Sequence, residues 1–199
     1  IQANANRLLN RNLLVVSKGK LRKKMESLPY VDSVSFRFDK GVLVLDGKLK
    51  ERGVVVSDGG ASYFHDEVYF LLDEKDVPGL VKEYSLVRIS PDFLQFCRKY
   101  GFPADFSKMA GALGGAKSSS NLITIADYDN NKSNILTGTL RVKFEDVESL
   151  LVVNDLRDEK MFSEAVEIIR NEYYDSKVRL AGEYLEYELS NGQLIRKKR

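Results

Sequence analysis

The first regular pattern of apolar and polar positions runs from residue 17 to residue 49. Residues 17–28 repeat apolar side chains at helical spacing opposite a cationic face, and Ser17 stands where an N-cap belongs. Residues 30–38 then alternate between apolar and polar, and a short turn leads into the apolar-rich run 42–49. The pattern predicts one helix followed by an antiparallel hairpin.

From residue 54 onward, short β-type runs dominate the pattern. Residues 54–72 contain two such runs on either side of a glycine pair, with a further turn near His65, which is typical of a β-meander. An Asn-Gly pair separates 177–189 from 193–197, and this pair between β-rich runs is a strong hairpin signal. Three more strands are expected at 122–127, 135–144 and 149–154.

Two helices and one loop complete the predicted order. Residues 91–100 begin with proline at a permitted first-turn position and end before Gly101. Residues 159–174 carry an apolar stripe at helical spacing, which predicts the one long helix of this part of the chain. Residues 107–121 are small, polar and glycine-rich without a sustained period, so we expect an exposed, mobile loop there.

The order of these elements predicts an α+β fold in two domains. We expect a small helix-plus-hairpin domain over residues 1–55 and a mostly antiparallel β domain with one long helix over residues 56–199. A domain of about 50 residues is only marginally stable alone. The division therefore makes a testable claim about which part folds independently.

The composition narrows the chemistry that these domains can carry. The 199 residues are 43% hydrophobic and 30% charged with a formal net charge of +2, which gives no global attraction to nucleic acid or to an anionic membrane. The single cysteine, Cys97, excludes an internal disulfide bond. With only one histidine, His65, the chain also lacks the ligands for a zinc site of two or more Cys or His. We expect no metal and no cofactor.

Three features invite a catalytic interpretation. Gly111–Ser118 matches the phosphate-loop pattern G-x-x-x-x-G-K-[ST] except that Ala116 replaces the second required glycine, so we expect no nucleotide binding. A nucleotide-binding enzyme or hydrolase stays the rival from another class. His65 reads as a turn histidine, and Cys97 reads as a small buried hydrophobe on an apolar helix face. We expect a protein without catalytic residues.

A cluster of cations marks the first predicted helix. It either contacts anionic lipid headgroups or forms a solvated helix face, and runs of charged residues more commonly form a solvated face. A second cluster at residues 196–199 reads as a terminal tail. Neither cluster contains aromatic residues on which nucleic-acid bases could stack. The first cluster comprises Lys18, Lys20, Arg22, Lys23 and Lys24.

The segment from Asn12 to Leu80 resembles the extracytoplasmic part of FtsQ, the bacterial cell division protein that is called DivIB in Gram-positive bacteria. Three stretches occur in the family's order: KGKLRKKMESLPYVDSV, VLVLDGKLKERGVVV, and SYFHDEVYF followed by VPGL. MFSEAVEIIRNEYY and EYLEYELSNGQLIRKK fit the family's late helix and last two strands. The family's opening strand and first helix are compressed or lost in IQANANRLLN, so the first domain is expected to be either incomplete or divergent.

The resemblance implies a POTRA domain and a mostly β domain, both outside the cytoplasmic membrane at the division septum. It implies attachment through a single transmembrane helix upstream of Ile1. It further implies a non-catalytic assembly protein that binds the bitopic division proteins FtsB (DivIC) and FtsL and links them to septal peptidoglycan synthesis. The alternative is a POTRA-bearing polypeptide-transport or chaperone module of the cell envelope.

Within this resemblance, the terminal hairpin is the expected partner site. An unpaired edge strand presents the row of N–H and C=O groups to which a partner strand can add. The side chains of the hairpin divide into two faces, and either choice of inward face leaves a tyrosine among the outward residues. The expected contact residues are Tyr184, Glu186, Tyr187, Glu188, Leu189, Leu194, Ile195 and Arg196.

Overall fold

A computed structural model describes residues 17–40, 42–120, 124–144, 147–175, 182 and 184–197. Its internal contacts divide the chain into two compact units, Ile1–Glu51 and Arg52–Arg199. The sequence places the division four residues later, between residues 55 and 56. The structure assigns residues 52–55 to the second unit, because Val54 and Val55 belong to a buried strand there.

The first unit contains the predicted helix and hairpin. Helix α2 (Lys18–Glu26) begins after Ser17, whose side chain accepts a hydrogen bond from the backbone N–H of Lys20, as the N-cap pattern predicts. Strands β1 (Val31–Asp39) and β2 (Val42–Leu49) pair antiparallel. The predicted loss of an opening strand and first helix concerns residues 1–16, which lie outside the described part of the chain. The unit buries Met25, Tyr30, Val31 and Val34.

The described part of the second unit forms one nine-stranded mixed sheet, in the order β11-β10-β9-β8-β7-β6-β3-β4-β5. Most neighbouring strands pair antiparallel, but β3 with β6, β6 with β7 and β9 with β10 pair parallel. The predicted meander and terminal hairpin are present, at opposite ends of the sheet. The strands are β3 (Val54–Ser57), β4 (Ser62–Asp66), β5 (Val68–Leu71), β6 (Ser85–Arg88), β7 (Thr124–Asn130), β8 (Gly138–Phe144), β9 (Ser149–Val153), β10 (Leu185–Ser190) and β11 (Gln193–Arg196).

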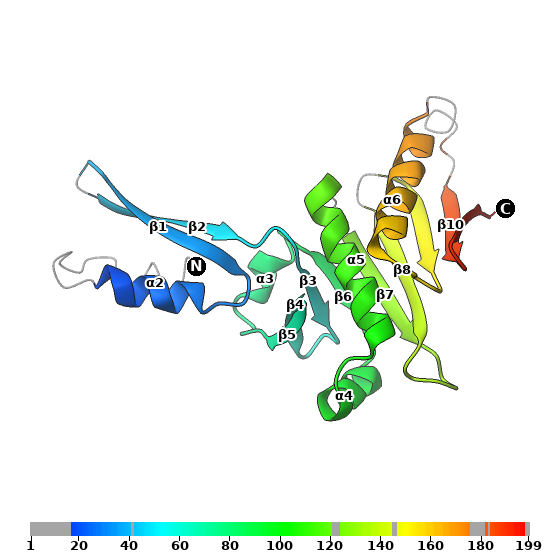
Figure 1. The fold of residues 1–199 in the computed structure, drawn as a ribbon, viewed down its shortest axis with the longest axis horizontal. Coiled ribbons are helices and arrows are strands. Elements are labelled where there is room, and N and C mark those ends of the chain that lie inside the picture. The colour runs from blue at the N-terminus through cyan, green and yellow to red at the C-terminus, as the bar shows by residue number, and fades with distance from the viewer. Residues whose placement is uncertain are drawn as a thin grey trace. The chain divides into compact units, whose positions relative to one another are not determined.

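Helices α5 (Ala104–Ser120) and α6 (Glu159–Tyr174) lie in front of this sheet in Figure 1. Predicted helices 91–100 and 159–174 are confirmed as α4 (Pro91–Tyr100) and α6 (Glu159–Tyr174), each with a side-chain N-cap from Ser90 or Asp158. A single turn, α3 (Val77–Leu80), precedes β6. The α+β class is confirmed, with strands and helices both well represented. Within the described residues, no helix combines the length and apolarity that crossing a membrane requires.

The expected loop at 107–121 is wrong, because helix α5 spans Ala104–Ser120. The second unit therefore has two long helices rather than one. Small residues without an amphipathic period suggested a loop, but this helix is buried on several sides at once, which leaves no polar stripe to detect. Its fully or almost fully buried side chains are Phe106, Met109, Ala110, Ala112, Leu113 and Ala116.

The glycines of α5 allow a close approach between the helix and the strand layer. A Cβ atom on Gly114 would stand 3.1 Å from the backbone carbonyl carbon and oxygen of Gly53, which immediately precedes β3. Such a contact is tighter than most Cβ atoms make, and the neighbour is backbone, so a side chain at this position is disfavoured. Gly111, one turn earlier, leaves more room, since its nearest neighbour would be Glu159 Oε1 at 3.4 Å.

Helix α6 and strand β10 complete the core at the other end of the sheet. Phe162, Val166 and Ile169 of the helix and Tyr187 of the strand are all almost completely buried in the same apolar cluster. Burying a large apolar side chain of this kind stabilises the folded state by about 1.5–3 kcal/mol. The core therefore holds the terminal hairpin on the sheet through β10.

We predict that residues 52–199 fold without residues 1–51, whereas residues 56–199 do not. The shorter fragment lacks Val54 and Val55, which are both completely buried, and each contributes about 1.5–3 kcal/mol of a total stability of about 5–15 kcal/mol. Urea unfolding followed by circular dichroism checks this. A cooperative transition in the shorter fragment, or none in the longer one, contradicts the assigned boundary.

We also predict that Gly114→Ala lowers the free energy of unfolding, although alanine is about 1 kcal/mol better than glycine within a helix. The added methyl group meets rigid backbone at 3.1 Å. Gly111→Ala is the matched control, and we expect it to be neutral or stabilising by up to about 1 kcal/mol. Equal effects of the two substitutions on the urea midpoint would rule out the proposed close contact.

Candidate functional site

The terminal hairpin places one strand at the edge of the sheet. Strand β10 lies between β9 and β11, whereas β11 pairs only with β10 among the described strands. The turn uses Asn191 and Gly192, which both have positive φ angles of 50° and 79°. Two successive left-handed residues are what a tight hairpin turn demands, and Asn-Gly satisfies that demand.

The two faces of β10 separate clearly in the structure. Leu185, Tyr187 and Leu189 are buried, whereas Glu186 and Glu188 are half-buried on the opposite face. Tyr184, just before the strand, is 39% exposed and is the tyrosine that faces outward. Of the residues predicted to contact a partner, Tyr187 and Leu189 therefore lie in the core.

Tyr187 connects the hairpin to helix α6. Its hydroxyl group donates a hydrogen bond to the carboxylate of Glu172, which also forms an ion pair with Arg196 of β11. Burial, together with this hydrogen bond, raises the pKa of Tyr187 above its ordinary value. Tyr187 and Arg196 thus support the hairpin from within the molecule.

On the other face, polar groups of neighbouring strands form a short hydrogen-bonded row. Thr139 donates to Asn154 at 2.9 Å, and Asn154 donates to Glu188 at 2.7 Å. Lys197 pairs with Glu188 at 2.8 Å, and this contact lowers the pKa of the carboxyl group. Among the apolar and aromatic residues predicted to contact a partner, Ile195 and Tyr184 are the most exposed, and Glu186 is half-buried.

The backbone hydrogen bonds of β11 show which of its residues face β10 and which face the open edge of the sheet. The N–H of Lys197 donates to the carbonyl oxygen of Glu186 at 2.8 Å. Backbone groups of successive residues in an antiparallel strand point to alternate sides, so Ile195 also faces β10. Leu194 then directs its N–H and C=O toward the open side of the sheet, while its half-buried side chain packs on the core.

The predicted basic helix has an exposed cationic face. All five cations of α2 are exposed, in the first unit and away from its buried Met25. The ammonium group of Lys18 lies 4.2 Å from the centre of the Phe38 ring, and the guanidinium of Arg22 lies 5.7 Å from the Phe36 ring. These two cations therefore make cation–π contacts with the hairpin of their own unit, so part of the positive charge of α2 has a structural role within that unit.

The sequence that resembles a phosphate loop is helical. Gly111–Ser118 lies within α5, where backbone N–H groups are used by the helix instead of being gathered around a ligand. Cys97 is 3% exposed in α4, and burial raises the pKa of its thiol to about 12. A thiol in this state carries little thiolate and is a poor nucleophile.

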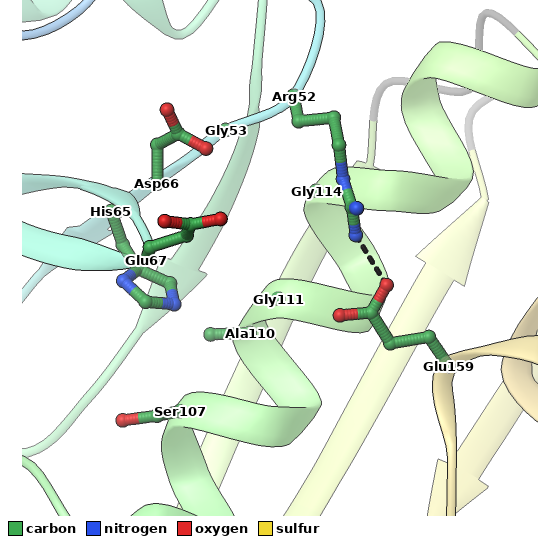
Figure 2. A pocket seen from close by; sticks show the side chains of 10 residues that line it. All are labelled: Arg52, Gly53, His65, Asp66, Glu67, Ser107, Ala110, Gly111, Gly114 and Glu159. Atoms are coloured by element: carbon green, nitrogen blue, oxygen red, sulfur yellow. Dashed lines mark hydrogen bonds and ion pairs between the residues drawn. The ribbon is translucent and has the colours of Figure 1, made fainter.

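A small polar pocket lies where the β4–β5 turn faces α5 and the start of α6. Figure 2 shows the carboxylate of Glu67 directed toward the middle of the pocket, opposite the ion pair between Arg52 and Glu159. The pocket encloses roughly 250 Å³. The sequence gives no signal for it, because its residues come from four separate segments. The lining comprises Arg52, Gly53, His65, Asp66, Glu67, Ser107, Ala110, Gly111, Gly114 and Glu159.

His65 forms one wall of this pocket and is 5% exposed. Its ring stacks on Tyr69 at 4.1 Å, and the Tyr69 hydroxyl donates to Ser107 at 3.0 Å. Burial lowers the pKa of His65, and its Nδ1 atom has no hydrogen-bond partner among the described residues. The described residues also contain no group of three or more His, Cys, Asp or Glu arranged to hold a metal ion. The pocket thus offers polar and charged walls without a nucleophile hydrogen-bonded to the histidine.

We predict that the free energy of unfolding falls as the pH drops through the ordinary histidine pKa of about 6.5. The folded state lowers the pKa of His65, so the unfolded state binds more protons in this range and acid favours unfolding. His65→Phe keeps a ring beside Tyr69 but removes the titration, so its stability should depend less on pH. Identical pH profiles for the two proteins between about pH 5 and 8 would contradict this prediction.

Comparison with known proteins assigns the chain to no family. No family model matches it, and no curated protein matches it in sequence. The resemblance to FtsQ and DivIB therefore stays a prediction that rests on the quoted stretches and on the order of the elements.

Proposed function

We propose that this chain is a non-catalytic assembly protein of bacterial cell division. In this proposal it binds bitopic division proteins of the FtsB (DivIC) and FtsL type outside the cytoplasmic membrane, at the division septum, and links them to septal peptidoglycan synthesis. The stretches between Asn12 and Leu80 support it. So does the element order, in which a helix and hairpin precede a mostly antiparallel unit that ends in a helix and a second hairpin.

The open edge of β11 is the observation that carries the proposal. A strand at the end of a sheet can accept a partner strand through main-chain hydrogen bonds, and pockets for alternate side chains then give specificity. Leu194 directs its backbone N–H and C=O toward that edge, since Ile195 and Lys197 face β10. An extended partner segment beside Leu194 would prolong the nine-stranded sheet by one strand.

The side chains around this edge suit an interface of modest size. Ile195 is 50% exposed and offers apolar contact area at this edge that a partner can bury, whereas Tyr184, which is 39% exposed, lies with Phe144 and Glu148 on the β9 side of β10. Tyr187 and Glu172 fix the hairpin from beneath and keep the edge in one conformation. A preformed edge lowers the entropy that a partner loses on binding.

The exposed cations of α2 belong to the same proposal. Lys20, Lys23 and Lys24 are exposed in the first unit, and anionic headgroups attract such clusters by about 1 kcal/mol per cation near a membrane surface. A first unit close to the outer surface of the cytoplasmic membrane is consistent with this charge. The contribution is electrostatic, so salt weakens it.

We predict that Leu194→Pro weakens binding of a purified FtsB or DivIC segment by about tenfold relative to Leu194→Ala. Both variants lose the half-buried side chain, but only proline removes the N–H that faces the open edge, and a hydrogen bond of this kind contributes about 0.5–1.5 kcal/mol. Isothermal titration calorimetry gives the affinities, and circular dichroism checks that both variants remain folded.

A variant with Lys20, Lys23 and Lys24 changed to alanine is the control for the first unit, and we expect its affinity to match the parent. Unchanged affinity in Leu194→Pro with loss in the lysine variant moves the partner site to the first unit. Absence of binding to any FtsB, DivIC or FtsL segment by the parent chain contradicts the proposed function itself.

A further inference from the structure

Strand β5 is the edge of the sheet opposite the terminal hairpin. Among the described strands it pairs only with β4, so its other side has no strand neighbour. The N–H of Leu72 donates to the carbonyl oxygen of Ser62 at 2.9 Å, which fixes the alternation of the backbone groups. Phe70 and Val68 then face β4, whereas Tyr69 and Leu71 direct their N–H and C=O groups outward.

The side chains of this edge are apolar and exposed. Val68, Phe70 and Leu71 are 57%, 41% and 66% exposed, and the strand contains no charge, proline or glycine. Natural sheets usually protect an open edge with charged residues, proline or a bulge within the strand. Strand β5 is only four residues long, which is itself a form of protection, but it has no charge, proline or bulge and exposes three large apolar side chains, so it is suited to pairing with a short segment.

Aromatic stacking holds this edge in a defined position. Tyr69 lies between His65, at 4.1 Å between ring centres, and Phe102, at 3.7 Å, and its hydroxyl group donates to Ser107 on α5. The side chain of Tyr69, one of the two residues whose backbone groups face outward, is thus fixed on the helical layer. A partner strand meets a preformed edge and orders little of it on binding.

Charge at the two ends of β5 indicates the kind of partner. Five carboxylates and one lysine occur between residues 66 and 76, and Lys75 already pairs with Asp73 at 2.6 Å. Glu67 and Glu74 are exposed at opposite ends of the strand. A second copy of this edge would bring carboxylates against carboxylates in either strand direction, which disfavours self-pairing. A segment with cations at both ends is complementary.

We propose that β5 is a second docking edge, which binds an extended polypeptide segment that has alternating apolar side chains and is flanked by lysine or arginine. The segment adds beside Tyr69 and Leu71 through main-chain hydrogen bonds, and its apolar side chains cover Val68 and Phe70. Its flanking cations lie near the carboxylates at the two ends of the strand, where Glu74 is exposed and Glu67 also borders the pocket beside α5 (Figure 2). This site is separate from β11 and does not depend on the function proposed above.

The test uses a fluorescent peptide with alternating valine and threonine between paired lysines, and a second peptide with glutamates in place of the lysines. Fluorescence anisotropy with the full chain should show binding of the lysine peptide that weakens as salt increases, and at least about tenfold weaker binding of the glutamate peptide. Leu71→Pro should weaken binding of the lysine peptide by about tenfold relative to Leu71→Ala, since only proline removes an outward N–H.

Leu194→Pro, at the opposite edge, is the matched control and should leave this affinity unchanged. Equal binding by Leu71→Pro and Leu71→Ala overturns the proposal, as does equal binding of the two peptides. Loss of binding in Leu194→Pro alone would place the peptide at β11 instead. If sedimentation shows a dimer of the full chain that Leu71→Pro abolishes, the occupant of this edge is a second copy and the argument from charge is wrong.

Discussion

The close approach of α5 to the strand layer is the constraint on which the rest of the second unit depends. At Gly114 the helix comes so near to Gly53 that even a methyl group would stand 3.1 Å from the Gly53 backbone. The helix contacts β3, β4, β6 and β8 and also packs against α6. Its position therefore determines how far the helical layer lies from the sheet. Tyr69 and Phe102 stack against each other beside this helix, and Tyr69 bonds to Ser107 on it. Small residues here determine the position of much larger ones.

Local patterns in the sequence predict those elements whose signals are contained in a short stretch. Ser17 and Pro91 mark helix starts, the Asn191-Gly192 pair marks a hairpin, and the stripe of α6 marks a helix, because each depends only on neighbouring residues. Helix α5 lacks such a signal, since its burial comes from partners far along the chain. The same reason hides the parallel neighbours of β6 and the segments that meet around His65. Tyr187 faces inward together with Leu185 and Leu189, and its hydroxyl group donates to the Glu172 carboxylate of α6, a partner that the hairpin sequence alone does not reveal.

The two edges of the sheet differ in how their charges are used. Around β11, Glu172 and Glu188 pair with Arg196 and Lys197, so the ionic groups largely compensate one another. Around β5 the carboxylates greatly outnumber the cations, and the strand between them is apolar. One sheet therefore presents two edges of different character, and in the two proposals above segments of different charge would add to its two ends without competing. A protein organised in this way is suited to holding partners side by side.

The parallel pairing of β9 with β10 also affects the order in which the chain folds. Parallel neighbours require a crossover, and here α6 lies in the crossover between Val153 and Leu185. Closing so long a loop costs more chain entropy than closing a hairpin, so contacts of this kind form slowly. Strand β11 pairs only with β10 among the described strands, so it becomes a sheet edge only after that closure. The β3–β4–β5 meander needs only short connections and can form early. The β5 edge can therefore be present from an early stage of folding. The β11 edge is present only after the crossover has closed and the sheet is complete.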